Sequence, residues 1–413
     1  MLKIVHLQTL VSFQGNAPMR LHEAMLDEGW QSKILIYNSP RANSNTLYRF
    51  SGVMKLLKAQ AYAYLQKAVA FRKKKNTYFF SYPKMVGNNV ANHPFVQQAD
   101  VIYLHWIVGG FLNLKNIEAL LKLGKPVVFF MHDMWTITGG CHHSFDCEGY
   151  KMNCEHCPLF ERDKKYSWAS TLFKEKKKLF SKYDNVYFMS PSKWLMSCAE
   201  QSGLLVGKSV SNIPNIVDEN VFKKIDNAVA KSILNFDKDT VTITFGCVAG
   251  KNNSYKGWDY LEKALKSIHA TRNDLKLNIV VFGSDYDQAT ADAIPFPIRF
   301  LGQINDQTTM MVLNNATDVF VSPTLAENFS QTLLENVMCQ TPVVGFNVGG
   351  VPEIIEHKKN GYLAAYKSAE DLANGILFCI DNKIEFDPPK QYFKKVLLNS
   401  HFQFMQSKVK NEA

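Results

Sequence analysis

The sequence lacks any apolar run of about 18 residues, the length that a helix needs to cross a bilayer. It also lacks low-complexity segments, and its 46% hydrophobic and 20% charged residues are typical of a globular protein. The start, residues 1–7, resembles a first strand rather than a signal peptide. These absences predict a cytoplasmic protein, in which the eight cysteines are thiols or metal ligands rather than disulfides.

Acidic residues are scarce in the first half of the chain. Residues 1–215 hold 27 Lys and Arg against 14 Asp and Glu, a balance of +13, whereas residues 216–413 hold 20 against 23, a balance of −3. Two dense basic runs, 72–75 and 174–178, are bordered by Phe71, Phe79, Leu172, Phe173 and Phe180. Such a surface predicts peripheral contact with anionic lipid at the inner face of the plasma membrane, although a solvated charged face is an equal alternative. No nucleic-acid-binding motif accompanies the charge, so nucleic acid is not expected as a partner.

Short β-rich runs alternate with longer helical stretches along the whole chain. One series of predicted strands covers residues 3–7, 32–37, 101–105, 126–131 and 186–190. A second series covers residues 241–248, 277–282, 298–301, 318–323 and 341–346. The alternation predicts βαβ units in two mostly parallel α/β sheets, because 413 residues exceed the usual size of one core. The connection 211–218, which contains Pro214, is the predicted hinge.

Two glutamates, Glu327 and Glu335, stand eight positions apart around the predicted start of a helix near Ser330. Glu327 follows a short buried strand, so it is expected at the carboxyl edge of a parallel sheet, where ligands bind. Glu335, two turns further along, is expected to reach the same place. Two solvated glutamates beside a helix start are the alternative.

The next predicted strand leads into the loop Asn347-Val348-Gly349-Gly350-Val351-Pro352-Glu353, in which adjacent glycines allow close approach of the backbone to a ligand. Together with the glutamate pair, residues 341–355 resemble the donor-sugar motif of glycosyltransferase family 4. The resemblance implies two Rossmann-like domains that face each other across a cleft, the GT-B fold. The implied domains are an acceptor domain over 1–213 and a nucleotide-sugar domain over 214–388. Residues 389–413 are expected to form a helix that crosses back to the first domain.

A small-residue loop, 249–258, follows the first strand of the second series and carries Lys251 and Lys256. Fixed cations at this place would stabilise the charge that develops on a departing nucleoside diphosphate. Family members usually carry an arginine beside the lysine, and here Lys251 is the nearest substitute.

The family resemblance also implies individual roles in donor binding. Glu335 is expected to hydrogen-bond the nucleotide ribose, and Glu327 to contact the transferred sugar. Backbone amides at the helix start are expected to hold sugar hydroxyls and phosphate; the residues concerned are Asn328, Phe329, Ser330, Gln331 and Thr332. No catalytic metal is expected, because lysines and a helix dipole neutralise the diphosphate.

In the first domain, Gly15 resembles the glycine of the family's first loop, which lies beneath the diphosphate and acceptor. His132 directly follows a predicted strand and is expected to hydrogen-bond the sugar or to position the acceptor hydroxyl. The alternative is a histidine with a purely structural hydrogen bond.

Half of the cysteines fall within seventeen residues, inside a predicted insertion near 139–158. The final Cys-x2-Cys spacing favours a structural Zn²⁺. Its predicted ligands are Cys141, Cys147, Cys154 and Cys157, although clustered free thiols remain an alternative. The preceding Trp135-Thr136-Ile137-Thr138-Gly139-Gly140-Cys141 resembles an insertion in family 4 enzymes that build bacterial surface polysaccharides such as colanic acid, capsule and O-antigen.

The resemblance therefore implies a retaining glycosyltransferase that uses a UDP- or GDP-sugar and a saccharide acceptor that is lipid-linked. Glu327, Lys256 and His132 are the expected catalytic residues. A nucleotide-sugar 2-epimerase of the same fold is one alternative. A zinc-containing nucleic-acid-binding module is another, but it does not explain the glutamate pair.

Overall fold

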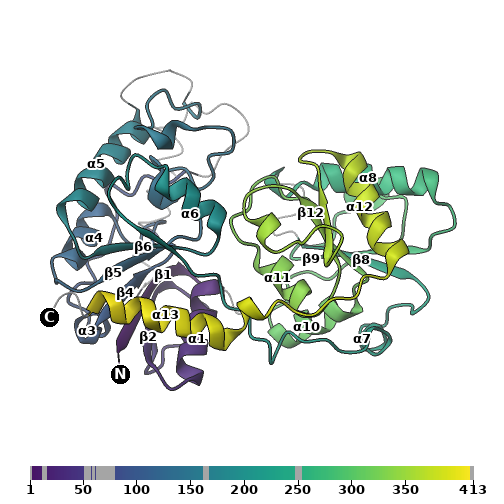
Figure 1. The fold of residues 1–413 in the computed structure, drawn as a ribbon, viewed down its shortest axis with the longest axis horizontal. Coiled ribbons are helices and arrows are strands. Elements are labelled where there is room, and N and C mark those ends of the chain that lie inside the picture. The colour runs from purple at the N-terminus through teal and green to yellow at the C-terminus, as the bar shows by residue number, and fades with distance from the viewer. Residues whose placement is uncertain are drawn as a thin grey trace. The chain divides into compact units, whose positions relative to one another are not determined.

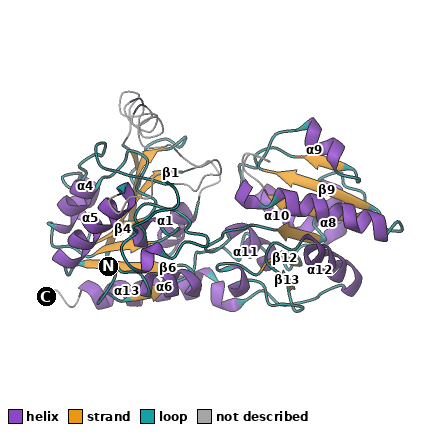
Figure 2. Cartoon of the chain, turned by 90° about the horizontal axis from the view of Figure 1, so that it is seen from above, coloured by secondary structure: helices purple, strands orange, loops and turns teal. Residues whose placement is uncertain are grey.

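The computed structural model describes residues 2–11, 16–50, 57, 61, 80–160, 167–246 and 254–409. The chain divides into two compact units. The first unit comprises Met1–Pro214 together with Leu397–Ala413, and the second comprises Asn215–Val396. In each unit, helices surround a parallel sheet (Figures 1 and 2).

The sheet of the first unit has seven strands in the order β3-β2-β1-β4-β5-β6-β7, all parallel. Its central strands are continuous buried apolar runs, as expected for strands covered on both faces. The strands are β1 (Lys3–Leu10), β2 (Gln31–Asn38), β3 (Leu47–Arg49), β4 (Val101–Leu104), β5 (Val127–Phe130), β6 (Val186–Ser190) and β7 (Val210–Asn212).

Side-chain caps start most helices of the first unit. Asn113 and Ser167 each form a capping box with the residue three positions on, which satisfies amides that have no partner within the helix. The described helices are α1 (Ala17–Asp27), α3 (Pro94–Gln98), α4 (Leu114–Leu121), α5 (Trp168–Lys182) and α6 (Lys193–Glu200).

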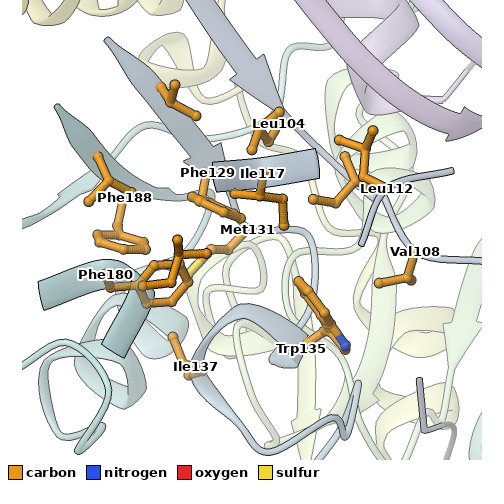
Figure 3. Close-up of a cluster of buried hydrophobic side chains, with 14 of the residues drawn as sticks. Leu104, Val108, Leu112, Ile117, Phe129, Met131, Trp135, Ile137, Phe180 and Phe188 are labelled. Carbon is orange, nitrogen blue, oxygen red and sulfur yellow. The ribbon is translucent and has the colours of Figure 1, made fainter. Parts of the chain in front are cut away.

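The core of the first unit lies between the sheet and helices α4 and α5. The Phe129 ring of β5 stacks on the Phe188 ring of β6, with centroids 5.6 Å apart. The Phe180 ring of α5 meets both rings edge-on, 5.3 Å from Phe129 and 5.1 Å from Phe188 (Figure 3). This interlocking of large rings fixes the carboxyl ends of the central strands, where polar residues follow.

The second unit contains six parallel strands in the order β10-β9-β8-β11-β12-β13. They are β8 (Val241–Gly246), β9 (Leu277–Phe282), β10 (Ile298–Phe300), β11 (Val319–Ser322), β12 (Val343–Phe346) and β13 (Gly361–Ala364). The helices are α7 (Asn227–Ile233), α8 (Trp258–Thr271), α9 (Gln288–Ala293), α10 (Gln307–Ala316), α11 (Gln331–Met338) and α12 (Ala369–Asn382).

The last helix, α13 (Lys394–Val409), begins in the second unit and groups with the first from Leu397 onward. Its buried His401 accepts or donates a 3.2 Å hydrogen bond with the Tyr103 hydroxyl of β4. The Phe402 ring lies 5.7 Å from that of Trp30. These contacts place α13, yellow in Figure 1, against the sheet and the turn between α1 and β2 of the first unit.

The predicted fold class is confirmed, since both units are Rossmann-like with parallel sheets. The ten predicted strands all appear, except that residues 247 and 248 of one lie outside the described ranges. Three short strands, β3, β7 and β13, were not predicted because runs of three or four residues carry too little periodicity.

The basic run 174–178 does not form the predicted surface of basic and apolar side chains. Lys176 and its apolar neighbours Leu172, Phe173 and Phe180 are buried, because their spacing forms the inward stripe of α5. Lys174, Lys177 and Lys178 are exposed. The other run, 72–75, and its neighbours Phe71 and Phe79 lie outside the described ranges. No helix within the described ranges is long and apolar enough to span a bilayer.

Candidate functional site

In the second unit, three neighbouring strands deliver the predicted donor-binding residues to one edge of the sheet. Strands β8, β11 and β12 are adjacent and parallel, so their carboxyl ends lie together. Lys256 follows β8, Glu327 follows β11, and the Gly349-Gly350 turn follows β12. The order of strands in the sheet, rather than closeness in sequence, brings these segments to one place.

Backbone hydrogen bonds tie the three loops to one another. The Leu325 amide donates to the Tyr255 carbonyl at 2.7 Å, and the Thr324 hydroxyl donates to the same oxygen at 3.2 Å. The Gly350 amide donates to the Glu327 carbonyl at 3.2 Å. The loop is therefore held at Thr324 and Leu325 and at the carbonyl of Glu327 itself, which limits where the Glu327 side chain can lie.

Two glycines make this close approach possible. Gly257 has φ +74° and Gly349 has φ +57°, both in the left-handed region that other residues rarely adopt. A Cβ atom on Gly257 would lie 1.8 Å from the Pro323 carbonyl oxygen, and a Cβ atom on Gly349 would lie 1.8 Å from the Glu327 carbonyl oxygen. Any larger residue at either position would push the loops apart.

Lys256 and Glu327 form an ion pair at this edge. The Lys256 ammonium lies 3.7 Å from Oε2 of Glu327, and the two side chains keep 27% and 18% of their surface exposed. Oε1 of Glu327 also accepts the Asn328 amide at 3.2 Å. Both charged groups thus reach solvent while they remain partly buried, the setting in which a ligand can compete for either one.

Glu335 lies one turn into α11 and is only 3% exposed. Burial, together with the charge of Glu335, raises the pKa of Cys339 to about 12. Only a small part of Glu335 is therefore accessible to a ribose in this arrangement.

The helix-start residues have separate structural tasks. Ser330 caps α11, since its hydroxyl accepts the Leu333 amide at 3.3 Å. The Phe329 ring is buried against Tyr392 at 5.6 Å, and Asn328 is 3% exposed. Gln331 donates to the Ile216 carbonyl at 3.3 Å, and the carbonyl of Thr332 accepts the Asn336 amide group. The side chains of Phe329 and Ser330 are thus already engaged, which leaves the backbone amides as their means of ligand contact.

Two predicted residues, Lys251 and Gly15, lie outside the described ranges. Their predicted roles stay predictions.

In the first unit, His132 follows β5 at the carboxyl edge of the sheet. It lines a small cavity of about 10 Å³ with His105, Trp106, Asp133 and Trp135 among its neighbours. Burial lowers the pKa of His132 to about 4, with Asp133 opposing the shift, so the imidazole is neutral at pH 7. Nε2 of His132 lies 2.9 Å from Nδ1 of His105.

Asp133 holds a different histidine. Its Oδ2 atom lies 2.6 Å from Nδ1 of His142, and its Oδ1 atom accepts the Trp135 amide at 2.8 Å. Burial opposes ionisation of Asp133, but the His142 charge and hydrogen bond and the Trp135 amide leave its pKa lowered overall. The adjacent residues His132 and Asp133 therefore do not act as one pair.

The four predicted zinc ligands come together around one cavity of about 20 Å³. Cys141, Cys147, Cys154 and Cys157 all line it. All four are free thiols, and Sγ of Cys154 accepts the Gly139 amide at 3.2 Å. A hydrogen bond from Cys141 lowers the pKa of Cys157, whereas burial raises that of Cys154 to about 12. Across the part of the chain that the structure describes, no three His, Cys, Asp or Glu side chains are arranged to hold a metal ion, so zinc binding stays a prediction.

A buried lysine borders this cysteine cluster. Lys176 is 0% exposed, and its ammonium donates to the carbonyls of Trp135 and Thr138 and lies 3.5 Å from the centre of the Trp135 ring. Burial lowers the pKa of Lys176 to about 7, while the thiol of Cys154 acts in the opposite direction. This lysine anchors the segment that carries the cysteines, a role hidden in the sequence within an ordinary basic run.

Residues 242–382 match the family model of the glycosyl transferases group 1. The matched stretch runs from β8 into α12 and contains Lys256, Glu327 and Glu335. It therefore covers the whole edge of the second sheet described above.

Two curated relatives are glycosyltransferases by name. An uncharacterized glycosyltransferase of Haemophilus influenzae is 26% identical over 179 residues, which are 42% of this chain and 45% of that protein. WcaC of Escherichia coli, a putative colanic acid biosynthesis glycosyl transferase, is 32% identical over 102 residues, which are 22% of this chain and 25% of that protein. The chain thus matches less than half the length of these curated relatives.

Solved structures resemble the chain over nearly its full length. Anabaena Alr3699/HepE, in complex with UDP and glucose, has a TM-score of 0.56 and 16% identity and covers 100% of this chain and 97% of its own. A glycosyltransferase from Rickettsia africae has a TM-score of 0.61 and 12% identity, with 99% of both chains covered. The fold is of the GT-B type.

Proposed function

We propose that this protein is a family 4 glycosyltransferase that moves a sugar from a nucleotide-sugar donor to a saccharide acceptor. The adjacency of Lys256 and Glu327 at the carboxyl ends of β8 and β11 carries this proposal. A cation and a carboxylate, fixed 3.7 Å apart by interlocked loops, match the two charges that a nucleoside diphosphate and a sugar ring present.

In this proposal Lys256 leaves Glu327 and pairs with the diphosphate when the donor binds. Its charge then stabilises the diphosphate as the bond to the sugar breaks. Glu327, released from the lysine, accepts hydrogen bonds from sugar hydroxyls, and Glu335 accepts one from the ribose. Backbone amides of residues 328–332 supply further donors for sugar hydroxyls or phosphate.

The reaction is proposed to retain the anomeric configuration by front-face attack. The bond between the sugar and the diphosphate oxygen breaks, the acceptor hydroxyl oxygen bonds to the same face, and its proton passes to the departing phosphate oxygen. No residue has to act as a nucleophile or base in this route. His132 of the first unit contributes a hydrogen bond to the sugar or to the acceptor.

The donor is proposed to be a UDP- or GDP-sugar, since Alr3699/HepE was solved with UDP and with UDP-glucose. The acceptor is proposed to be a lipid-linked saccharide in bacterial surface polysaccharide synthesis, which the name of WcaC supports. Such an acceptor would bring the protein to the inner face of the plasma membrane, where the exposed lysines of α5 would contact anionic lipid.

Thermal stabilisation by a panel of UDP- and GDP-sugars tests the proposal, because a ligand stabilises a protein by RT ln(1 + [L]/Kd). We expect one nucleotide series to raise the unfolding temperature of the wild type and Lys256→Met to lose that rise. Lys266→Met is the matched control, since Lys266 forms an exposed ion pair with Glu262 on α8 at 2.8 Å.

Two results would count against the proposal. One is an equal rise in Lys256→Met and in the control, which would remove Lys256 from the donor site. The other is conversion of the sugar nucleotide to an isomer without any acceptor, which would identify a 2-epimerase instead.

A further inference from the structure

Three histidines of the first unit form a hydrogen-bonded chain across neighbouring strands. His6 lies on β1, His105 directly follows β4 and His132 follows β5, and these strands are adjacent in the sheet. Nδ1 of His6 lies 3.0 Å from Nε2 of His105, and Nδ1 of His105 lies 2.9 Å from Nε2 of His132. Successive rings are stacked, with centroids 5.3 Å and 5.1 Å apart.

All three rings are neutral near pH 7, because burial is the largest cause that lowers each pKa. A neutral imidazole has one N–H, which is a donor, and one bare nitrogen, which is an acceptor. Only two proton arrangements then keep both hydrogen bonds. In the outward arrangement each Nδ1 carries the hydrogen, and in the inward arrangement each Nε2 carries it.

The buried end of the chain distinguishes these arrangements. Nε2 of His6 is shielded from solvent and has no hydrogen-bond partner among the described residues. The hydroxyl of Tyr103, whose ring centroid lies 5.2 Å from that of His6, is engaged with His401 at 3.2 Å. The inward arrangement would leave an N–H donor unsatisfied there, whereas the outward arrangement leaves only a lone pair. Unsatisfied buried N–H groups are the rarer and costlier of the two.

We propose that the histidine chain adopts the outward arrangement and that His105 is a positioning residue. It holds His132 as the tautomer with its hydrogen on Nδ1. His132 then offers an N–H donor, and its other nitrogen is occupied by His105. The cavity beside it, of about 10 Å³, has room for one hydroxyl-sized group. The inference rests on the proposed function only for the identity of that group, a sugar or acceptor hydroxyl oxygen.

The same geometry argues against proton conduction along the chain. In the outward arrangement Nδ1 of His132 already carries its hydrogen and cannot take up a proton, and Nε2 of His6 at the other end has no partner among the described residues through which a proton could pass. The chain thus orients the outer ring and cannot carry a proton away. This agrees with a reaction in which the departing phosphate takes the acceptor's proton.

Nitrogen NMR of the protein labelled with ¹⁵N-histidine tests the tautomer directly, without any substrate. We expect the signals of His132, assigned by their loss in His132→Gln, to show a protonated Nδ1 and a bare Nε2 at pH 7.5. A bare Nδ1 with a protonated Nε2 would overturn the proposal. Because this readout is independent of catalysis, it separates failure of the inference from failure of the proposed function.

Substitution of His105 tests the positioning role. In His105→Leu, the His132 tautomer should change or become mixed, and kcat/KM for transfer should fall about tenfold, the order expected for one hydrogen bond. The matched control is His22→Leu, because His22 is also buried in this unit and its hydrogen bond goes to Ser32 at 2.8 Å rather than to the histidine chain. An unchanged tautomer in folded His105→Leu would refute the role. If that variant does not fold, the wild-type spectrum alone decides.

Discussion

Acid should destabilise the first unit, because it buries neutral histidines. His6, His22, His105 and His401 are between 0% and 7% exposed. Burial lowers the pKa of His22 to about 4 and that of His401 to about 3, from an ordinary value near 6.5, and lowers those of His6 and His105 well below it. Below about pH 6.5 the unfolded chain therefore binds protons that the folded chain does not bind, and the free energy of unfolding decreases as the pH is lowered.

The size of the effect follows from His22 and His401. The contribution of each of these histidines to the free energy of unfolding falls by about 1.4 kcal/mol for each pH unit of acidification. Over the roughly 1.5 units between the unfolded pKa and pH 5, this amounts to about 2 kcal/mol. The two together remove about 4 kcal/mol, and His6 and His105 add to this in the same direction. A domain whose free energy of unfolding is about 5–15 kcal/mol should therefore lose a large share of it by pH 5.

Urea unfolding followed by tryptophan fluorescence provides the assay, since five of the six tryptophans lie in the first unit. The free energy of unfolding should be at least about 4 kcal/mol lower at pH 5 than at pH 7. His22→Gln should show about 2 kcal/mol less of this pH dependence. A difference between the two pH values below about 1 kcal/mol would refute the neutral-histidine account and weaken the tautomer argument with it.

Three further predictions concern single features of the structure. Gly349→Ala should weaken donor binding at least tenfold, because its Cβ would lie 1.8 Å from the Glu327 carbonyl. Gly302→Ala, with φ +62° and no atom closer than 3.9 Å, should leave binding unchanged, and equal loss in both would deny the loop contact. Elemental analysis should find about one zinc per chain, lost in Cys154→Ser, if the four thiols close around a tetrahedral ion. Metal-free protein with four reactive thiols would contradict this. Deletion of residues 397–413 should destabilise the first unit by several kcal/mol, since burial of Leu397, Leu398 and Met405 contributes about 2 kcal/mol each. An unchanged melting temperature would contradict the assignment of α13 to this unit.

The position of the proposed donor-site residues at one sheet edge could be predicted from the sequence, because they lie at strand ends within recognisable segments. Lys256 and Glu327 each follow a buried strand, and the structure places their charges 3.7 Å apart. The glycine requirement at Gly257 was not predicted. It depends on the distance to Pro323 in the neighbouring loop, which only the strand order creates.

The histidine chain could not be predicted, although each of its members was visible. His105 ended a predicted strand and His6 lay within the first one, but their contact depends on β4 lying between β1 and β5. A histidine within or directly after each of three strands was the only signal. The burial of Lys176 could not be predicted for a related reason. In a run of lysines the sequence does not indicate which one points inward, because that depends on how the helix packs.

Sugar transfer by the Glu327→Gln variant is the most direct test of the central claim. Purified wild-type protein, given the nucleotide-sugar that stabilises it and a lipid-linked saccharide acceptor, should form product, and Glu327→Gln should reduce kcat/KM at least a hundredfold. Glu262→Gln, which removes a carboxylate from the ion pair of α8, should retain wild-type activity. Full transfer by folded Glu327→Gln protein would contradict the account.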